Sequence, residues 1–126
     1  MEGIIDLEAL AGKEVVNAFA LHDLERGWLQ QVVFRVEGIY LVVAVDADHD
    51  EAVLSLLPAL DFTVLDQRYS RTVLSNQRKK INWIWRMTNQ RGYEDGFQIE
   101  FDDRERTCVQ IVAEGSRLEI SVFRKF

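Results

Sequence analysis

The chain has 126 residues, of which 48% are hydrophobic and 29% charged, and its formal net charge is −6. This length suits one core, and the composition is that of a globular protein. The N-terminus has no apolar run with a basic flank, and the only cysteine is Cys108, which excludes an internal disulfide. We therefore expect a single cytoplasmic domain, residues 1–126, with no signal peptide and no membrane span.

The first predicted element is a short helix over about residues 6–11, because Asp6 can cap its start and Gly12 can end it. Four apolar stretches follow, and they read "EVVNAFAL", "WLQQVVFRV", "IYLVVAV" and "AVLSLL". They predict four strands, since Val32, Phe34 and Val36 alternate with polar residues and "IYLVVAV" is apolar on both faces, as a central strand would be. The segment 58–70 is less regular, and we expect a short edge strand there at Phe62–Leu65.

The stretch "RYSRTVLSNQRKK" opens the second half and is interpreted as a solvated helical face, with a helical turn that ends near Asn76. An alternative is a site for phosphate or for an acidic surface, formed by the five basic residues Arg68, Arg71, Arg78, Lys79 and Lys80.

Four further alternating stretches predict four more strands, and they read "KINWIWRMT", "GFQIEFD", "TCVQIVA" and "RLEISVF". In the first of them the period of two places Trp83 and Trp85 on a buried face with Ile81, and Ile84 and Arg86 on the opposite face. We therefore expect the two tryptophans to form a wall of the core.

Together these elements predict a mainly β fold, at the margin of α+β. It has about eight antiparallel strands in two four-stranded meanders, each preceded by a short helical turn. The segments 4–57 and 70–124 would then be an internal repeat. Each meander alone leaves an apolar face bare, so we expect the two to pack as a sandwich or as one strongly curved sheet.

Charge is distributed unevenly along the chain. Residues 1–63 hold 12 acidic and 3 basic residues, a net charge of −9, whereas residues 64–126 hold 9 acidic and 12 basic residues, a net charge of +3. Such asymmetry indicates a partner of opposite charge, or the chain's own other half. It argues against nucleic acid as the partner, since the protein is acidic overall.

The stretch "VDADHDEA" resembles the start of an EF-hand loop, because Asp46, Asp48 and Asp50 have its spacing. However, Glu51 stands where that loop requires glycine, and Leu57 stands where it requires glutamate. We therefore interpret the stretch as an acidic turn between two strands. No tight calcium site and no other metal site is expected.

No catalytic arrangement stands out. His22 and His49 could ligate a metal or a haem iron, but neither lies in a known metal or haem motif. Cys108 lies in an apolar strand, which suits an inert thiol, and no glycine-rich phosphate loop is present. The sequence therefore favours a protein that is not an enzyme and that has no cofactor.

The stretch "TNQRGYEDGFQ" lies between two predicted strands, and we expect an ordered loop from Thr88 to Asp95. Gly92 and Gly96 suit a positive φ or a bulge where the chain re-enters the sheet. Arg91 and Glu94 have no such structural role, so they are candidate partner contacts.

The run Met87–Gln98, which reads "MTNQRGYEDGFQ", resembles a stretch of small uncharacterised bacterial proteins, cyanobacterial ones among them. The resemblance covers roughly a tenth of the chain. It implies a bacterial source and an unknown function, and it supplies no activity, cofactor or catalytic residue.

These observations favour a non-catalytic protein-binding module, in concrete form an immunity-type inhibitor that covers a basic toxin. The candidate partner-binding residues are Asp46, Asp48, Asp50, Glu51, Arg91 and Glu94. One alternative is a small-ligand protein, for example a haem binder, or an enzyme whose site is assembled by the fold. Another is a self-associating structural protein, a homodimer being the simplest form. Neither nucleic acid nor a membrane is an expected partner.

Overall fold

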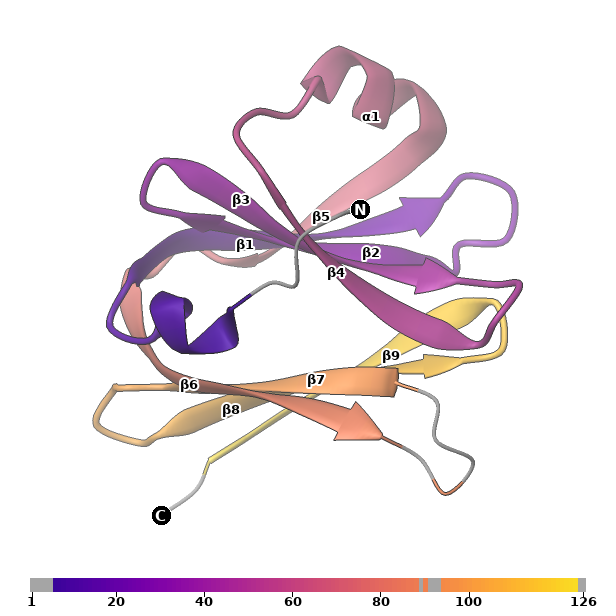
Figure 1. The fold of residues 1–126 in the computed structure, drawn as a ribbon. Coiled ribbons are helices and arrows are strands. Elements are labelled where there is room, and N and C mark those ends of the chain that lie inside the picture. The colour runs from indigo at the N-terminus through magenta and orange to yellow at the C-terminus, as the bar shows by residue number, and fades with distance from the viewer. Residues whose placement is uncertain (1–5, 89, 91–93, 125–126) are drawn as a thin grey trace.

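The computed structural model describes residues 6–88, 90 and 94–124, except for the side chain of Glu94. Within these residues, nine antiparallel strands form one sheet, which folds back on itself into two layers without closing into a barrel (Figure 1). The predicted mainly β architecture is therefore confirmed. No helix in the described part of the chain is long and apolar enough to cross a membrane.

The first layer begins with a 3-10 helix, η1 (Leu7–Leu10), which Asp6 caps by accepting a hydrogen bond from the Glu8 amide. Consecutive hairpins then join four strands, β1 (Glu14–Asp23), β2 (Leu29–Val36), β3 (Ile39–Asp46) and β4 (Glu51–Leu57). Helix α1 (Phe62–Arg68) follows, and β5 (Tyr69–Ser75) returns to pair with the free side of β1.

The second layer is the second predicted meander. Its strands are β6 (Lys79–Thr88), β7 (Glu94–Phe101), β8 (Thr107–Glu114) and β9 (Arg117–Arg124), and each pairs with the next. The layers are joined where the start of β1 pairs with the start of β6, through Glu14 with Lys80 and Val15 with Lys79. This join makes one sheet of the two layers.

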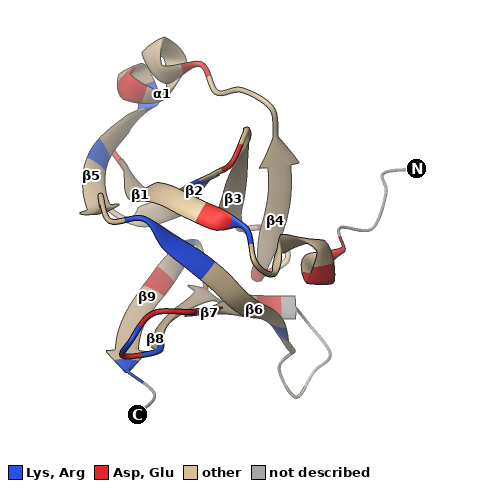
Figure 2. Ribbon diagram, turned by 90° about the vertical axis from the view of Figure 1, so that its left-hand side faces the viewer, with Lys and Arg blue, Asp and Glu red and all other residues tan. Residues whose placement is uncertain are grey.

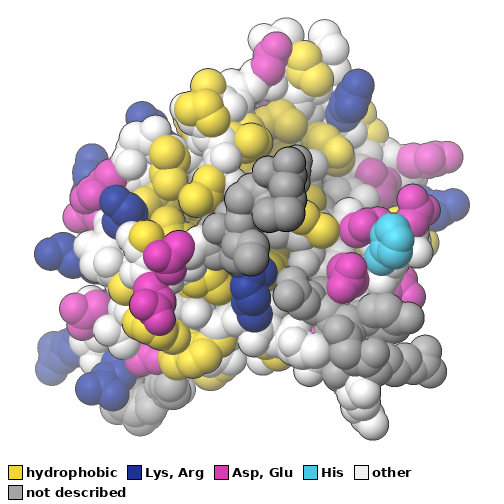
Figure 3. Space-filling model, viewed as in Figure 1, with side chains coloured by type: hydrophobic (Ala, Val, Ile, Leu, Met, Phe, Trp, Pro, Cys, Tyr) yellow, Lys and Arg dark blue, Asp and Glu magenta, His cyan; other side chains and the backbone are white. Residues whose placement is uncertain are grey.

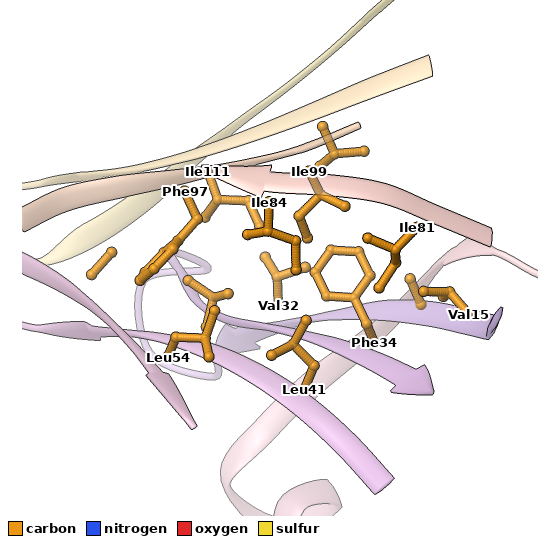
Figure 4. Packing of buried hydrophobic residues seen from close by; sticks show 14 of the residues in the cluster. Val15, Val32, Phe34, Leu41, Leu54, Ile81, Ile84, Phe97, Ile99 and Ile111 are labelled. Atoms are coloured by element: carbon orange, nitrogen blue, oxygen red, sulfur yellow. The ribbon is translucent and has the colours of Figure 1, made fainter. Parts of the chain in front are cut away.

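The main core fills the space between the two layers (Figure 4). From the first layer come Val32, Phe34, Leu41 and Leu54, and from the second come Ile84, Phe97, Ile99 and Ile111. All of these side chains are buried, and alternate residues along each strand provide them, as the period of two predicts.

The predicted faces of β6 are wrong beyond Ile81. The register between β6 and β7 pairs Ile81 with Phe101 but Trp83 with Glu100, so Asn82 is an extra residue in a β-bulge. A bulge shifts the alternation by one residue. Ile84 therefore points into the core, and Trp83 lies on the outer face with 38% of its surface exposed. Trp85, at 37% exposed, shares that face.

The segment between the meanders also differs from the prediction. Phe62–Leu65 belongs to helix α1 and is not an edge strand, because the Asp61 carboxylate caps the helix through the amide of Val64. The apolar side chains of this helix pack on the outer face of the first layer, where they form a second small core with Phe19.

Apart from Arg68, which ends helix α1, the basic stretch forms β5, the turn after it and the start of β6, and not the helical face and helical turn near Asn76 that were predicted. Its Tyr, Thr and Val residues favour extended backbone, and pairing with β1 satisfies one edge of the new strand. The helix that precedes the second meander is thus α1, which lies one strand earlier than predicted.

Gly96 in β7 permits a close approach between strands. A Cβ atom at this position would lie 2.5 Å from the carbonyl oxygen of Ile111. The register shifts between Met87 and Thr88, so a β-bulge does lie beside Gly96, as one of the two predicted roles requires. The other predicted role, a positive φ, is not found at this glycine.

Candidate functional site

A gap in the pairing of β1 creates the main candidate site. On one side β1 pairs with β2, and on the other it pairs first with β6 through residues 14–15 and then with β5 through residues 18–23. Residues 16–17 pair with neither β5 nor β6. The chain passes from one layer to the other here, from Ser75 to Lys79, and β6 begins with basic residues close to an acidic residue of β1 (Figure 2).

A cleft of about 530 Å³ lies between the layers at this corner, and we call it the interlayer cleft. Its apolar lining consists of Val15, Ala18, Phe34, Leu74, Phe101, Val109, Ile120 and Val122. The deep wall is core: Phe34 is 2% exposed and Phe101 is 5% exposed. At the mouth, Leu74 and Val122 are 42% and 64% exposed, so the entrance is apolar as well.

Polar groups occupy one rim of the interlayer cleft, where Lys79 and Thr107 meet Asp103. The ammonium of Lys79 lies 3.2 Å from Asp103 Oδ2, and the same carboxylate accepts hydrogen bonds from the amide and the hydroxyl of Thr107, both at 2.7 Å. Burial acts to raise the pKa of Asp103, but the hydrogen bonds from Thr107 and Lys79 outweigh it and hold that pKa below its usual value. The charge of Lys79 is therefore neutralised at the rim.

The remaining polar lining comes from Ser75, Asn76 and Gln77, which carry hydroxyl and amide groups. Among the described residues that line the cleft, Lys79 is the one ionisable side chain, and it is committed to Asp103. The site can thus hold an apolar body and donate or accept a few hydrogen bonds. It presents no general base with a nucleophile beside it.

The acidic turn predicted at residues 45–52 joins β3 to β4, and its own hydrogen bonds fix it. Asp46 accepts a hydrogen bond from the amide of Asp48 at 3.1 Å, and its other oxygen lies 2.8 Å from His49 Nδ1. This contact raises the pKa of His49 and lowers that of Asp46. Asp48 and Asp50 are exposed. Figure 3 shows acidic side chains gathered around a histidine on one face of the molecule.

The other predicted partner residues are only partly placed. β6 ends at Thr88 and β7 begins with Glu94, so the expected antiparallel pair exists, and Glu94 stands at the strand start. Its side chain lies outside the described structure, as do residues 89 and 91–93, which include Arg91.

Neither histidine lines the interlayer cleft: His22 lies in β1 and His49 in the acidic turn. Cys108 is buried in β8. In the described part of the chain no group of three or more His, Cys, Asp or Glu side chains is placed to hold a metal ion.

A comparison with known families shows that the model of a family of unknown function matches residues 1–126. The chain belongs to the family of unknown function DUF6334. No curated protein and no solved structure matches it. For this member of DUF6334, function must therefore be inferred from the geometry of the site.

Sequence reasoning missed the interlayer cleft in this DUF6334 chain because its lining comes from seven different strands. One local signal was present in "LSNQRKK", where six polar or basic residues follow Leu74 without any turn motif. That composition marks the corner at which β5 ends and β6 begins, but it does not indicate which side chains the corner faces.

Proposed function

We propose that this protein is a non-catalytic binding protein that holds an apolar, uncharged ligand in the interlayer cleft. The observation that carries the proposal is a hollow of about 530 Å³ whose deep wall consists of core side chains. Covering apolar surface is favourable, and a ligand in this hollow would cover the exposed apolar side chains of Leu74 and Val122 at its mouth. Volume and lining are those of small-molecule sites.

The rim supports an uncharged ligand in particular. Lys79 is neutralised by Asp103, so a ligand anion would compete with an existing ion pair for this ammonium. The hydroxyl and amide groups of Ser75, Asn76 and Gln77 favour a ligand with one or two hydrogen-bonding groups at the end nearest the mouth.

The test uses the uncharged fluorescent dye Nile red and a series of straight-chain alcohols as competitors. Leu74→Ser and Val122→Ser change exposed positions at the mouth, so both variants should fold, and the double variant should bind the dye about tenfold more weakly. Val53→Ser is the matched control, since Val53 is 44% exposed on β4, away from the cleft. NMR of the methyl groups should show the largest ligand-induced shifts at Val15 and Val109.

Two outcomes would refute the proposal. One is dye binding that Val53→Ser weakens as much as the double mouth variant does. The other is a protein that binds neither the dye nor any of the alcohols at their solubility limits.

A second candidate function, an immunity-type inhibitor of a basic protein, is supported by the acidic turn. Asp46 fixes the turn, so the carboxylates of Asp48 and Asp50 are presented without a further loss of backbone entropy on binding. Among ion pairs with both partners described, only Arg78 with Glu14 joins residues 1–63 to residues 64–126. Asp48 and Asp50 are exposed and take part in none of these ion pairs, so their charges can steer a partner.

The test is capture of a partner from the cell of origin across a salt series. Asp48→Asn with Asp50→Asn should reduce capture and its salt dependence, because the pair of charges is lost and asparagine tolerates the positive φ of Asp50. Asp102→Asn with Glu114→Gln removes the same charge from other exposed positions and should leave capture unchanged. Equal effects from both pairs would show a general charge effect and count against this role of the turn.

A further inference from the structure

A second hollow, of about 330 Å³, lies on the outer face of the first layer, next to α1. We call it the arginine hollow, because Arg35 and Arg71 line it together with the rings of Phe19, Tyr40 and Phe62. Asn17 and Asn76 complete its polar lining. It is distinct from the interlayer cleft, although Ala18 and Asn76 line both.

One wall of the arginine hollow is a row across three strands. Asn17 of β1 pairs in register with Arg35 of β2, which pairs with Tyr40 of β3. Side chains directly opposite each other in a sheet are near neighbours, so the amide, guanidinium and phenol project side by side. Arg35 is exposed and forms no ion pair with any residue that the structure describes.

The other wall holds the guanidinium of Arg71 in place. The guanidinium carbon of Arg71 lies 5.0 Å from the ring centre of Phe62 and 5.7 Å from that of Phe19. Its Nη2 atom lies 3.2 Å from Asp66 Oδ2. A guanidinium has five N–H donors, so the contact with Asp66 leaves others for a further acceptor. Stacking on the two rings fixes the orientation of those donors before any ligand arrives.

The chemistry of the arginine hollow selects an anion. Its described lining contains two arginines and no acidic side chain, in a protein with a net charge of −6. Asp66 neutralises Arg71 from beside the lining, so the guanidinium without an ion pair among the described residues is that of Arg35. Guanidinium groups match the oxygens of carboxylates and phosphates in pairs of parallel hydrogen bonds. The aromatic rings beside them offer an apolar wall for the rest of a ligand.

We propose that the arginine hollow binds an oxyanion, carboxylate or phosphate, carried on a flat apolar body. This inference is independent of ligand binding in the interlayer cleft. An uncharged ligand suits the cleft, whereas only an anion uses the two guanidinium groups.

Three small probes test the proposal with the full chain: phenyl phosphate, benzoate and the uncharged benzyl alcohol, followed by amide NMR shifts at low salt. Phenyl phosphate or benzoate should shift amides of β1, β2 and β5 and should bind more weakly as salt is added, whereas benzyl alcohol should not bind there. Saturation by phenyl phosphate alone or by benzoate alone identifies which oxyanion the hollow prefers.

Two variants make the test specific. Arg35→Gln removes an exposed guanidinium and should weaken binding about tenfold or more while the melting temperature is kept. Arg104→Gln removes the same charge from an exposed position in the turn before β8 and should change nothing. Arg71→Gln should also weaken binding, but the contacts of Arg71 with α1 make Arg35 the cleaner position.

The proposal fails if neither anion binds in the millimolar range, or if Arg104→Gln weakens binding as much as Arg35→Gln, because attraction by general charge would then suffice. It also fails if benzyl alcohol shifts the same amides as benzoate with equal affinity. Nile red binding at the interlayer cleft should be unaffected by Arg35→Gln, so the outcomes of the two proposals can be separated.

Discussion

Ile84→Ala and Trp83→Ala form a pair that tests the β-bulge at Asn82. Ile84 is 3% exposed, and its replacement removes about three CH2-sized groups, worth roughly 2.4 kcal/mol, with a cavity term that brings the expected cost to about 3–4 kcal/mol. Trp83 is 38% exposed on the outer face, so its loss should cost only about 1–2 kcal/mol. The smaller side chain should therefore matter more than the larger one.

The measurement is urea unfolding followed by far-UV circular dichroism, since tryptophan fluorescence would itself change with Trp83→Ala. Both variants should unfold with the slope of the parent, so that the difference in midpoint reports stability. Met87→Ala, on the outer face of the same strand, is a second outward control and should behave like Trp83→Ala.

A larger loss for Trp83→Ala than for Ile84→Ala would refute the bulge. Without the bulge, strict alternation from Ile81 would bury Trp83, and its removal would then cost about 3–5 kcal/mol, as for a core tryptophan. Ile84 would face solvent and its replacement would be nearly neutral.

Three further results are expected. The pKa of His49, measured by NMR, should lie above its ordinary value near 6.5, because its hydrogen-bonded ion pair with Asp46 raises it, and should return towards that value in Asp46→Asn. The stability that this ion pair adds is complete below the ordinary pKa and is lost as pH rises through the raised pKa of the folded protein. Asp103→Ala should lower the free energy of unfolding by about 1–3 kcal/mol, because the carboxylate accepts two hydrogen bonds from Thr107. In the parent protein the stability from this carboxylate should be lost as pH falls through its lowered pKa, and acid titration followed by circular dichroism measures that loss. Gly96→Ala should lower the melting temperature in a thermal scan, since its methyl group would meet the carbonyl of Ile111; an unchanged melting temperature would show that the strands can separate at no cost.

The apolar pattern predicted the two meanders: strands of the second layer bury mainly one face and alternate, whereas β3 is apolar on both faces, as a central strand is. It failed in β6 because one extra residue, Asn82, shifts the alternation without any mark in composition. The helix at Phe62–Arg68 was missed although Asp61 is a good cap, since the aromatic and β-branched residues that follow favour a strand when taken alone. Helical spacing of these residues stabilises the segment only after the first layer has formed, because their side chains then pack on its outer face.

The candidate sites divide in the same way. The acidic turn could be predicted because it is local, and the hydrogen bond from Asp46 to the residue two positions later is an ordinary feature of such turns. The interlayer cleft and the arginine hollow could not be predicted. Arg35 and Arg71 are well separated in sequence, and only the pairing of β5 with β1 brings their strands to the same part of the sheet.

The join at β1 also shapes how the chain can fold. Nearly all other strand pairs are hairpins between neighbours, which close quickly, whereas the join brings together segments such as Glu14 and Arg78, 64 residues apart. We therefore expect each meander to form first and the two to dock late, along the seam between β1 and β6. Residues on both sides of that seam line the interlayer cleft, so a ligand there recognises only the docked state. Such a ligand should therefore slow unfolding and leave the folding rate unchanged.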